Sequence, residues 1–182
     1  GPEGAPSNAR SFFGEGIDLV PVAYDDAVRA PDPLRASPPM HPSYEDRPGA
    51  PDRIFAALDD GVTQHLTSEW ARILAAPGVL EGVELAHLHH LTPIHEAVAR
   101  LRPDLPVVTH LHGTELLMLD EADAGAAWPH EAQWRARMRR WARDSDEVIV
   151  GSEPSRADAE RLLGIDPGRI TVVPNGVDLG IF

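Results

Sequence analysis

The chain has 182 residues, which is enough for one domain with a substantial hydrophobic core. Its formal net charge of −13 argues against the basic surface that nucleic-acid binding requires, so no nucleic-acid partner is expected. The absence of cysteine excludes disulfides and thiolate chemistry. No apolar run approaches the ~20 residues of a membrane span, and no signal peptide is recognisable, so the expected location is cytoplasmic.

The N-terminal third of the chain carries few regular signals. Residues 1–16 contain several glycines and small polar residues and are expected to form a loop or a frayed end. Residues 16–24 alternate apolar positions, which predicts a strand, and Pro21 places it at a sheet edge or a strand terminus. Residues 31–53 hold seven prolines and no periodicity, which predicts a long irregular loop. Its Tyr44–Arg47 segment either contacts a polar ligand or is solvated surface.

A long amphipathic helix is predicted from Ile54 onward. Apolar residues recur about every four positions from there, and Pro77-Gly78 ends the pattern. This helix is expected to cover one face of a sheet, with Trp70 in the core.

The middle of the chain reads as strand, helix, strand. The apolar run 83–90 predicts a strand, Thr92-Pro93 begins a helix, and the run 106–112 predicts a second strand. Two apolar strands joined by a crossover helix indicate a parallel, buried pair.

A second amphipathic helix is expected to begin at Trp128. Its predicted buried stripe consists of Trp134, Met138 and Trp141. The Arg135–Arg143 segment of this helix carries five arginines. These indicate either a solvated basic face or peripheral contact with an anionic membrane surface.

The remaining elements complete an alternating pattern. A helix starts at Thr114, and the apolar runs 147–152 and 169–174 predict strands on either side of a helix that Gly164 closes. The alternation of strands and helices predicts an α/β fold, specifically a Rossmann-like doubly wound parallel sheet.

Six of the nine histidines lie between positions 87 and 112. The pairs His87/His89 and His110/His112 each share one face of a predicted strand, a pattern that can bind zinc. One alternative function is therefore a metal-dependent hydrolase. Both faces of a parallel sheet are usually covered, however, so His87 and His110 are expected to be buried and hydrogen-bonded, and no metal site is predicted.

The candidate site lies at the carboxyl ends of the strands, where open parallel sheets bind ligands. His89 and His90 follow the first strand of the central unit, and His112 follows the second. Gly113 permits a tight turn and Thr114 can cap the next helix, whose N-terminus should lower the pKa of His112. A neutral imidazole beside free helix N–H groups suits a polyhydroxylated ligand that carries phosphates.

The C-terminal part of the chain adds a family resemblance. The strand 148–152, the helix that ends at Gly164 and the sequence V-P-N-G-V-D at 173–178, followed by Phe182, resemble the region before the hinge in family-4 retaining glycosyltransferases of the GT-B fold. Upstream, H-L-H-H and T-H-L-H-G-T are similar to the strand-end histidine motifs of that family. The resemblance spans residues 83–182.

This resemblance implies the acceptor-binding, N-terminal half of a hexosyltransferase-type enzyme. Such an enzyme moves a sugar from a nucleotide-diphosphate sugar to an acceptor hydroxyl and needs no metal or other cofactor. The resemblance implies that His112 is catalytic and lies beside the transferred sugar. The implied substrate-binding residues are His89, His90, Gly113, Thr114, Ser152, Asn175 and Gly176. The acceptor-side domain would comprise residues 17–176, and residues 177–182 would begin the interdomain hinge.

The sequence departs from the family pattern in two places. The glycine-rich loop after the family's first strand has no counterpart here, and the first strand–helix–strand segment is missing. The chain also ends at Phe182, where the C-terminal donor-binding domain is expected to begin, so this chain alone is expected to be inactive. A non-catalytic binding domain that docks a partner through the arginine-rich helix is the remaining alternative.

Overall fold

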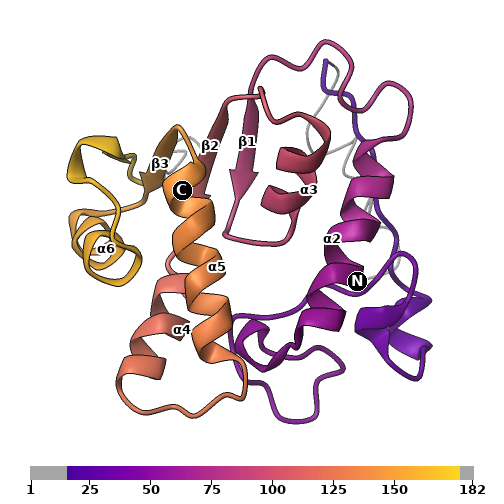
Figure 1. Ribbon diagram of the computed structural model, residues 1–182, viewed down its shortest axis with the longest axis horizontal. Helices are drawn as coiled ribbons and strands as arrows, with labels where there is room; N and C mark the ends of the chain where they lie inside the picture. The colour runs from indigo at the N-terminus through magenta and orange to yellow at the C-terminus, as the bar shows by residue number, and fades with distance from the viewer. Residues whose placement is uncertain (1–15, 177–182) are drawn as a thin grey trace.

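The computed structural model describes residues 16–176, which form an α/β domain (Figure 1). The predictions of a frayed end over residues 1–15 and of a hinge at 177–182 lie outside the described residues. Within the described range, the sheet has four parallel strands in the order β1-β2-β3-β4. The strands are β1 Ala86–His89, β2 Val107–Leu111, β3 Glu147–Val150 and β4 Ile170–Val172.

Helices join each pair of neighbouring strands, as a parallel sheet requires. The helices are α2 Asp60–Leu74, α3 Ile94–Leu101, α4 Thr114–Asp123, α5 Glu131–Asp144 and α6 Glu153–Asp158. The connection from β1 to β2 is α3, that from β2 to β3 is α4 and α5, and that from β3 to β4 is α6. A π turn over Ala159–Leu163 continues α6 until Gly164 ends it with φ 71°. The predicted α/β class with a parallel sheet is confirmed.

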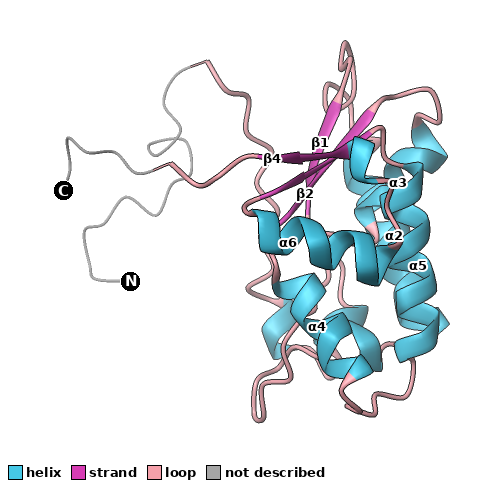
Figure 2. Cartoon of the chain, turned by 90° about the vertical axis from the view of Figure 1, so that its left-hand side faces the viewer, coloured by secondary structure: helices cyan, strands magenta, loops and turns pink. Residues whose placement is uncertain are grey.

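The main helices of residues 16–176 pack on one face of the sheet. When parallel strands follow one another in chain order with right-handed crossovers, every connection lies on the same side. Figure 2 accordingly shows α2, α3 and α5 together on one side of the strands. The strand residues that point to this side are buried: Leu88, Thr109, Leu111, Val148, Val150 and Ile170. From α5, the predicted stripe of Trp134, Met138 and Trp141 completes this core.

A row of hydrogen-bonded side chains crosses the packed side of the sheet from α3 to α5. Nδ1 of His95 donates to the carbonyl oxygen of Thr92 (3.0 Å), and Nε2 lies 3.0 Å from the hydroxyl of Thr109 on β2. That hydroxyl lies 2.6 Å from the hydroxyl of Ser145, which donates to the carbonyl oxygen of Trp141 (2.8 Å). The side chains of His95, Thr109 and Ser145 therefore each have a hydrogen-bond partner. The buried ring N–H of Trp141 has none within the described residues.

Two predictions for the N-terminal third are wrong. Residues 16–24 form no strand, because no strand of the described residues offers them a backbone ladder. The long helix begins at Asp60 rather than at Ile54. The carboxylate of Asp59 caps it there by accepting from the backbone N–H of Val62 (2.8 Å).

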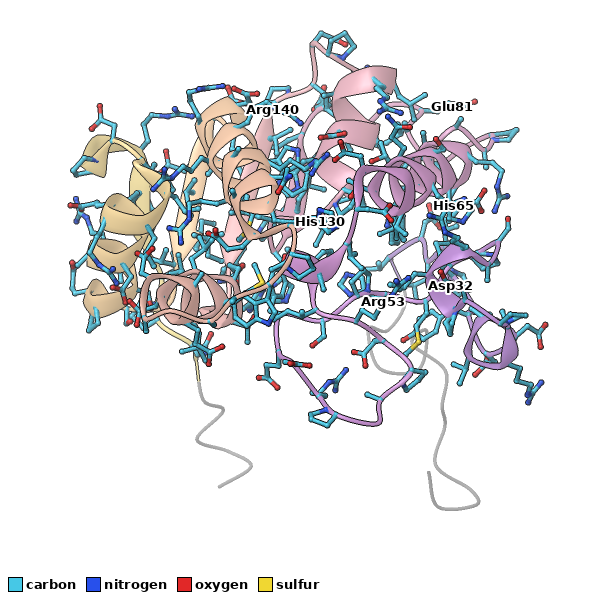
Figure 3. All side chains as sticks on the ribbon, turned by 60° about the horizontal axis from the view of Figure 1, so that its bottom comes forward. Asp32, Arg53, His65, Glu81, His130 and Arg140 are labelled. Carbon is cyan, nitrogen blue, oxygen red and sulfur yellow. The ribbon has the colours of Figure 1, made fainter. Side chains whose placement is uncertain are left out.

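The proline-rich loop 31–53 is held against the strand ends. Arg53 donates to both carboxylate oxygens of Asp32 (2.9 and 3.1 Å), a pair labelled in Figure 3. Tyr44 is buried, and its hydroxyl donates to the carbonyl oxygen of Leu91 just after β1 (2.7 Å). The loop therefore forms an ordered boundary beside the sheet edge.

The opposite face of the sheet carries histidines and is open among residues 16–176. His87 and His89 are exposed, and His110 is half-buried. The expectation that His87 and His110 are buried is therefore wrong. That expectation assumed helices on both faces of the sheet, whereas the main described helices pack on one.

Candidate functional site

The carboxyl ends of the strands lie at one edge of the sheet, because every neighbouring pair in the described range is parallel. His89 ends β1 and His112 follows β2, while Ser152 and Asn175 come shortly after β3 and β4. We call this edge, formed by the residues that follow the four strands, the rim. The candidate residues predicted from the sequence all fall on the rim.

A row of imidazoles occupies the part of the rim formed by β1 and β2. Nδ1 of His89 lies 2.7 Å from Nε2 of His112, so one ring donates a hydrogen bond to the other. The ring centroid of His112 lies 4.5 Å from that of His90 and 4.5 Å from that of His110. The rings therefore restrain one another, while His112 itself remains exposed.

His90 adopts a left-handed backbone conformation with φ 60°, which is unfavourable for a residue with a side chain. Its ring lies between Tyr44 and His112, with centroid separations of 5.4 and 4.5 Å. Strained residues of this kind concentrate at functional sites, so the conformation of His90 marks the rim as a candidate site.

A buried carboxylate joins the imidazoles to the start of α4. Glu115 is fully buried and accepts from the ring of His90 (3.3 Å) and from the hydroxyl of Thr114 (3.2 Å). It also accepts from the backbone N–H of His112 (3.4 Å). Glu115 therefore holds both strand ends to α4, a role that the sequence-based predictions missed.

Two of the rim histidines, His89 and His112, have lowered pKa values, which favours their neutral form. Partial burial lowers the pKa of His112, and the neighbouring His90 lowers it further. Partial burial also lowers the pKa of His89, followed by repulsion from His87 and His110. The direction agrees with the prediction for His112, although burial rather than the start of α4 is the main cause. A neutral ring can both donate and accept hydrogen bonds at pH 7.

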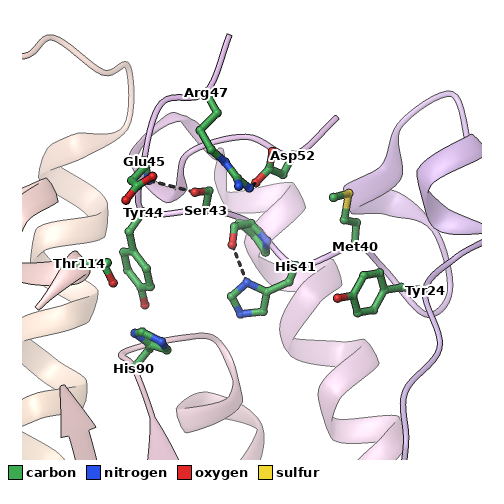
Figure 4. A pocket seen from close by; sticks show the side chains of 11 residues that line it. Tyr24, Met40, His41, Ser43, Tyr44, Glu45, Arg47, Asp52, His90 and Thr114 are labelled. Carbon is green, nitrogen blue, oxygen red and sulfur yellow. Dashed lines mark hydrogen bonds and ion pairs between the residues drawn. The ribbon is translucent and has the colours of Figure 1, made fainter. Parts of the chain in front are cut away.

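A cavity of about 410 Å³ opens beside this row of rings (Figure 4). Two rim residues, His90 and Thr114, line it together with polar groups of the proline-rich loop. The loop supplies His41, Ser43, Tyr44, Glu45, Arg47 and Asp52. Asp52 is buried and pairs with Arg47, yet its Oδ1 has no hydrogen-bond partner within the described residues. Such a cavity can bind a ligand with several hydroxyl groups.

A second cavity of about 410 Å³ adjoins the first and is more apolar. The two cavities share Tyr24, Met40, His41 and Pro42. The further lining residues are aliphatic or aromatic: Val20, Val22, Pro39, Phe55, Leu66, Trp70 and Pro93. Trp70, which the sequence places in the core, is only partly buried because it lines this cavity.

The other predicted site residues lie along the rim but do not line these two cavities. Gly113 has φ 94°, the left-handed conformation that the turn into α4 needs. The hydroxyl of Ser152 accepts from the backbone N–H of Ser155 (3.3 Å) and thereby caps α6. Asn175 and Gly176 are exposed after β4. The structure thus places His90 and Thr114 at one cavity, with the ring of His112 against that of His90, and leaves the later residues further along the rim.

The arginines of α5 are engaged within the molecule. Four of the five arginines in the segment Arg135–Arg143 form ion pairs with carboxylates. The fifth, Arg139, donates to the carbonyl oxygen of Leu162 (2.9 Å). This arrangement gives no support to membrane contact or partner docking through free basic side chains. Within residues 16–176, no helix combines the length and apolarity needed to cross a bilayer.

The fold and the rim together define the class of protein. A parallel α/β sheet with imidazoles, helix starts and a polar cavity at its carboxyl edge is a Rossmann-like ligand-binding domain. Residues 21–180 match the family model described as Glycosyltransferase Family 4, so the chain belongs to that family. No curated protein matches the chain. The family predicted from the sequence is confirmed, and the fold agrees with one Rossmann-like half of a GT-B glycosyltransferase.

Proposed function

We propose that this domain is the acceptor-binding half of a retaining glycosyltransferase, which moves a hexosyl group from a nucleotide-diphosphate sugar to an acceptor hydroxyl. The observation that carries this proposal is the position of His112. Its exposed ring lies just after β2 and beside the start of α4, in hydrogen-bond contact with His89. The neighbouring ring, that of His90, lines the polar cavity.

His112 would act on the transferred sugar by its position rather than as a nucleophile. A neutral ring can fix a sugar hydroxyl while charge develops at the anomeric carbon, and such positioning lowers the barrier without a covalent intermediate on the protein. His89 restrains the ring of His112, and Glu115 restrains its backbone N–H. The turn at Gly113 leaves the first N–H groups of α4 available to a donor phosphate. This proposal requires no metal ion.

The two adjoining cavities favour an acceptor that has a polar and an apolar part. Arg47 and Asp52 in the polar cavity suit hydroxyl groups, while Phe55 and Trp70 in the second cavity suit an apolar group. Burial of that group would contribute about 25 cal/mol per Å² of apolar surface. An acceptor with an alkyl or aryl group should therefore bind more tightly than the same acceptor without it. Equal affinities in a competition measurement would contradict this part of the proposal.

The later rim residues belong, in this proposal, to the cleft shared with a donor-binding domain. Ser152, Asn175 and Gly176 lie away from the acceptor cavities, towards β3 and β4. The donor nucleotide would be held mainly by that second domain. On this proposal residues 16–176 bind the acceptor, and turnover requires the donor-binding domain as well.

The test is the complete enzyme with the substitution His112→Ala. We expect kcat to fall at least ~10-fold, a bound below the ~10²–10⁴-fold that a positioned proton-transfer group contributes, with little change in the unfolding temperature. His130→Ala is the matched control, because its ring lines neither cavity. Unchanged kcat in the His112→Ala enzyme would refute the assigned role.

A further inference from the structure

We propose that His87, His89 and His110 form a zinc site on the open face of the sheet. Their ligating nitrogens all lie within 4.8 Å of one another. Zinc plays no part in the sugar transfer proposed above, although the two sites share the contact between His89 and His112. The sequence alone predicts no metal site, because it places two of these rings in the protein interior.

Strand geometry brings the three imidazoles together. Residues two apart on a strand share a face, so His87 and His89 project from β1 on the same side. The parallel register then pairs His89 with His110 of β2. Two of the ligands therefore lie on β1 and the third on β2, so the regular strands alone fix the relative positions of all three.

The three rings are close enough to converge on one ion. The ring centroid of His87 lies 4.8 Å from that of His89 and 5.8 Å from that of His110. The centroids of His89 and His110 are 5.3 Å apart. Zinc–nitrogen bonds of about 2.0–2.1 Å imply nitrogens about 3.4 Å apart in a tetrahedral site. Small side-chain rotations bring the nitrogens from separations of at most 4.8 Å to that spacing.

His112 supplies the outer hydrogen bond that metal-binding histidines usually have. Nδ1 of His89 lies 2.7 Å from Nε2 of His112, which leaves Nε2 of His89 for the ion.

The ligand set selects for zinc over hard cations. Three imidazoles without a carboxylate suit zinc, whereas Mg²⁺ and Ca²⁺ prefer oxygen ligands. His87 and His89 are exposed and His110 is half-buried. The fourth position of a tetrahedral ion would therefore face solvent and hold a water molecule.

The test is calorimetric titration of zinc chloride into the untagged, chelator-treated chain at neutral pH, since an affinity tag would add histidines. We expect one zinc ion per chain. His87→Ala should weaken the affinity at least ~10-fold, because even the loss of an outer partner of a metal ligand usually costs that much. The ring of His87 is exposed, so this variant should keep the wild-type unfolding temperature in the absence of zinc. His110→Ala should weaken zinc binding to a similar extent.

His130→Ala is the matched control and should leave the zinc affinity unchanged, because this ring lies outside the cluster. X-ray absorption at the zinc edge should show imidazole nitrogens and an oxygen, and excess Mg²⁺ should not displace the ion. The proposal is overturned by the absence of saturable binding, by half an ion per chain, or by wild-type affinity in His87→Ala.

Discussion

The two faces of the sheet place the same residue type in opposite surroundings. On the packed side, His95 is buried, stacks on Trp141 and is hydrogen-bonded at both ring nitrogens. Burial there lowers its pKa to about 4. On the open face, His89 is exposed and its nearest aromatic neighbours are other imidazoles. The comparison teaches that the chemistry of a histidine in this fold depends on the side of the sheet that it occupies.

The largest effect on stability is expected on the packed side. Trp134 is fully buried, and its ring N–H donates to the carbonyl oxygen of Leu58 (3.0 Å). Trp134→Ala should lower the free energy of unfolding by about 3–5 kcal/mol, the usual cost of removing a large buried side chain. Urea unfolding followed by circular dichroism measures this change. A loss below about 1 kcal/mol, typical of an ordinary substitution, would contradict the assignment of the core to this side.

His95 on the packed side should make the free energy of unfolding depend on pH. Its pKa is about 4 in the folded protein and about 6.5 when unfolded, so the unfolded state takes up a proton first as the pH falls. Stability from this residue is therefore full above pH 6.5, falls by about 3 kcal/mol between pH 6.5 and 4, and then stays level. His95→Gln should flatten most of that slope in urea unfolding across the same pH range. A slope unchanged from the wild type would assign the effect to other groups.

The rim, where the two sides of the sheet meet, should show a smaller effect. Tyr44→Phe removes the hydroxyl that donates to the carbonyl oxygen of Leu91 and leaves that buried acceptor unpaired. We expect the free energy of unfolding to fall by about 1–2 kcal/mol in urea. Tyr24→Phe is the matched control, because Tyr24 is 46% exposed. Equal losses in the two variants would mean that the contact of the loop with the rim contributes no stability.

The smallest effect is expected on the open face. His87→Ala removes an exposed ring and should change the free energy of unfolding by less than about 0.5 kcal/mol, the range of surface substitutions. The measurement needs a chelator, so that bound zinc does not contribute. His95→Ala, its counterpart on the packed side, should cost several times more. Similar losses for the two substitutions would show that the faces do not differ in the way described.

The arrangement of elements could be predicted because buried positions recur at fixed intervals along a helix or strand. The apolar stripe of α5 and the central strand–helix–strand unit follow from that periodicity. The positions of the helix ends do not follow from periodicity, because local hydrogen bonds determine where a helix begins and ends. α5 begins at Glu131 rather than at Trp128, and the cap at Asp59 starts α2 inside an apolar pattern that continues on both sides of it.

The position of the site at the strand ends could be predicted from the sequence. The burial of its side chains could not. His89 and His112 lie on the rim because residues at the carboxyl end of parallel strands share one edge. The role of Glu115 as a buried acceptor could not be predicted, because acidic residues are also common in the first turn of exposed helices. The exposure of His87 and His110 depends on which face of the sheet the helices cover. This depends on the tertiary packing, which the spacing of residues along the sequence does not reveal.

The buried row of hydrogen-bonded groups between the carbonyl oxygens of Thr92 and Trp141 contains four close contacts. With a neutral imidazole, only three polar hydrogens are available for these four contacts. The carbonyl oxygens at both ends can only accept, so the ring of His95 and the hydroxyl of Ser145 must each donate outward. The single hydrogen of Thr109 is then left with two acceptors. A proton added to His95 would supply the fourth hydrogen, so that every contact would have a donor. Nδ1 would still donate to Thr92, and the other three contacts would all point towards α5. At neutral pH the hydrogen-bonded row between the sheet and its helices therefore has one hydrogen fewer than it has contacts.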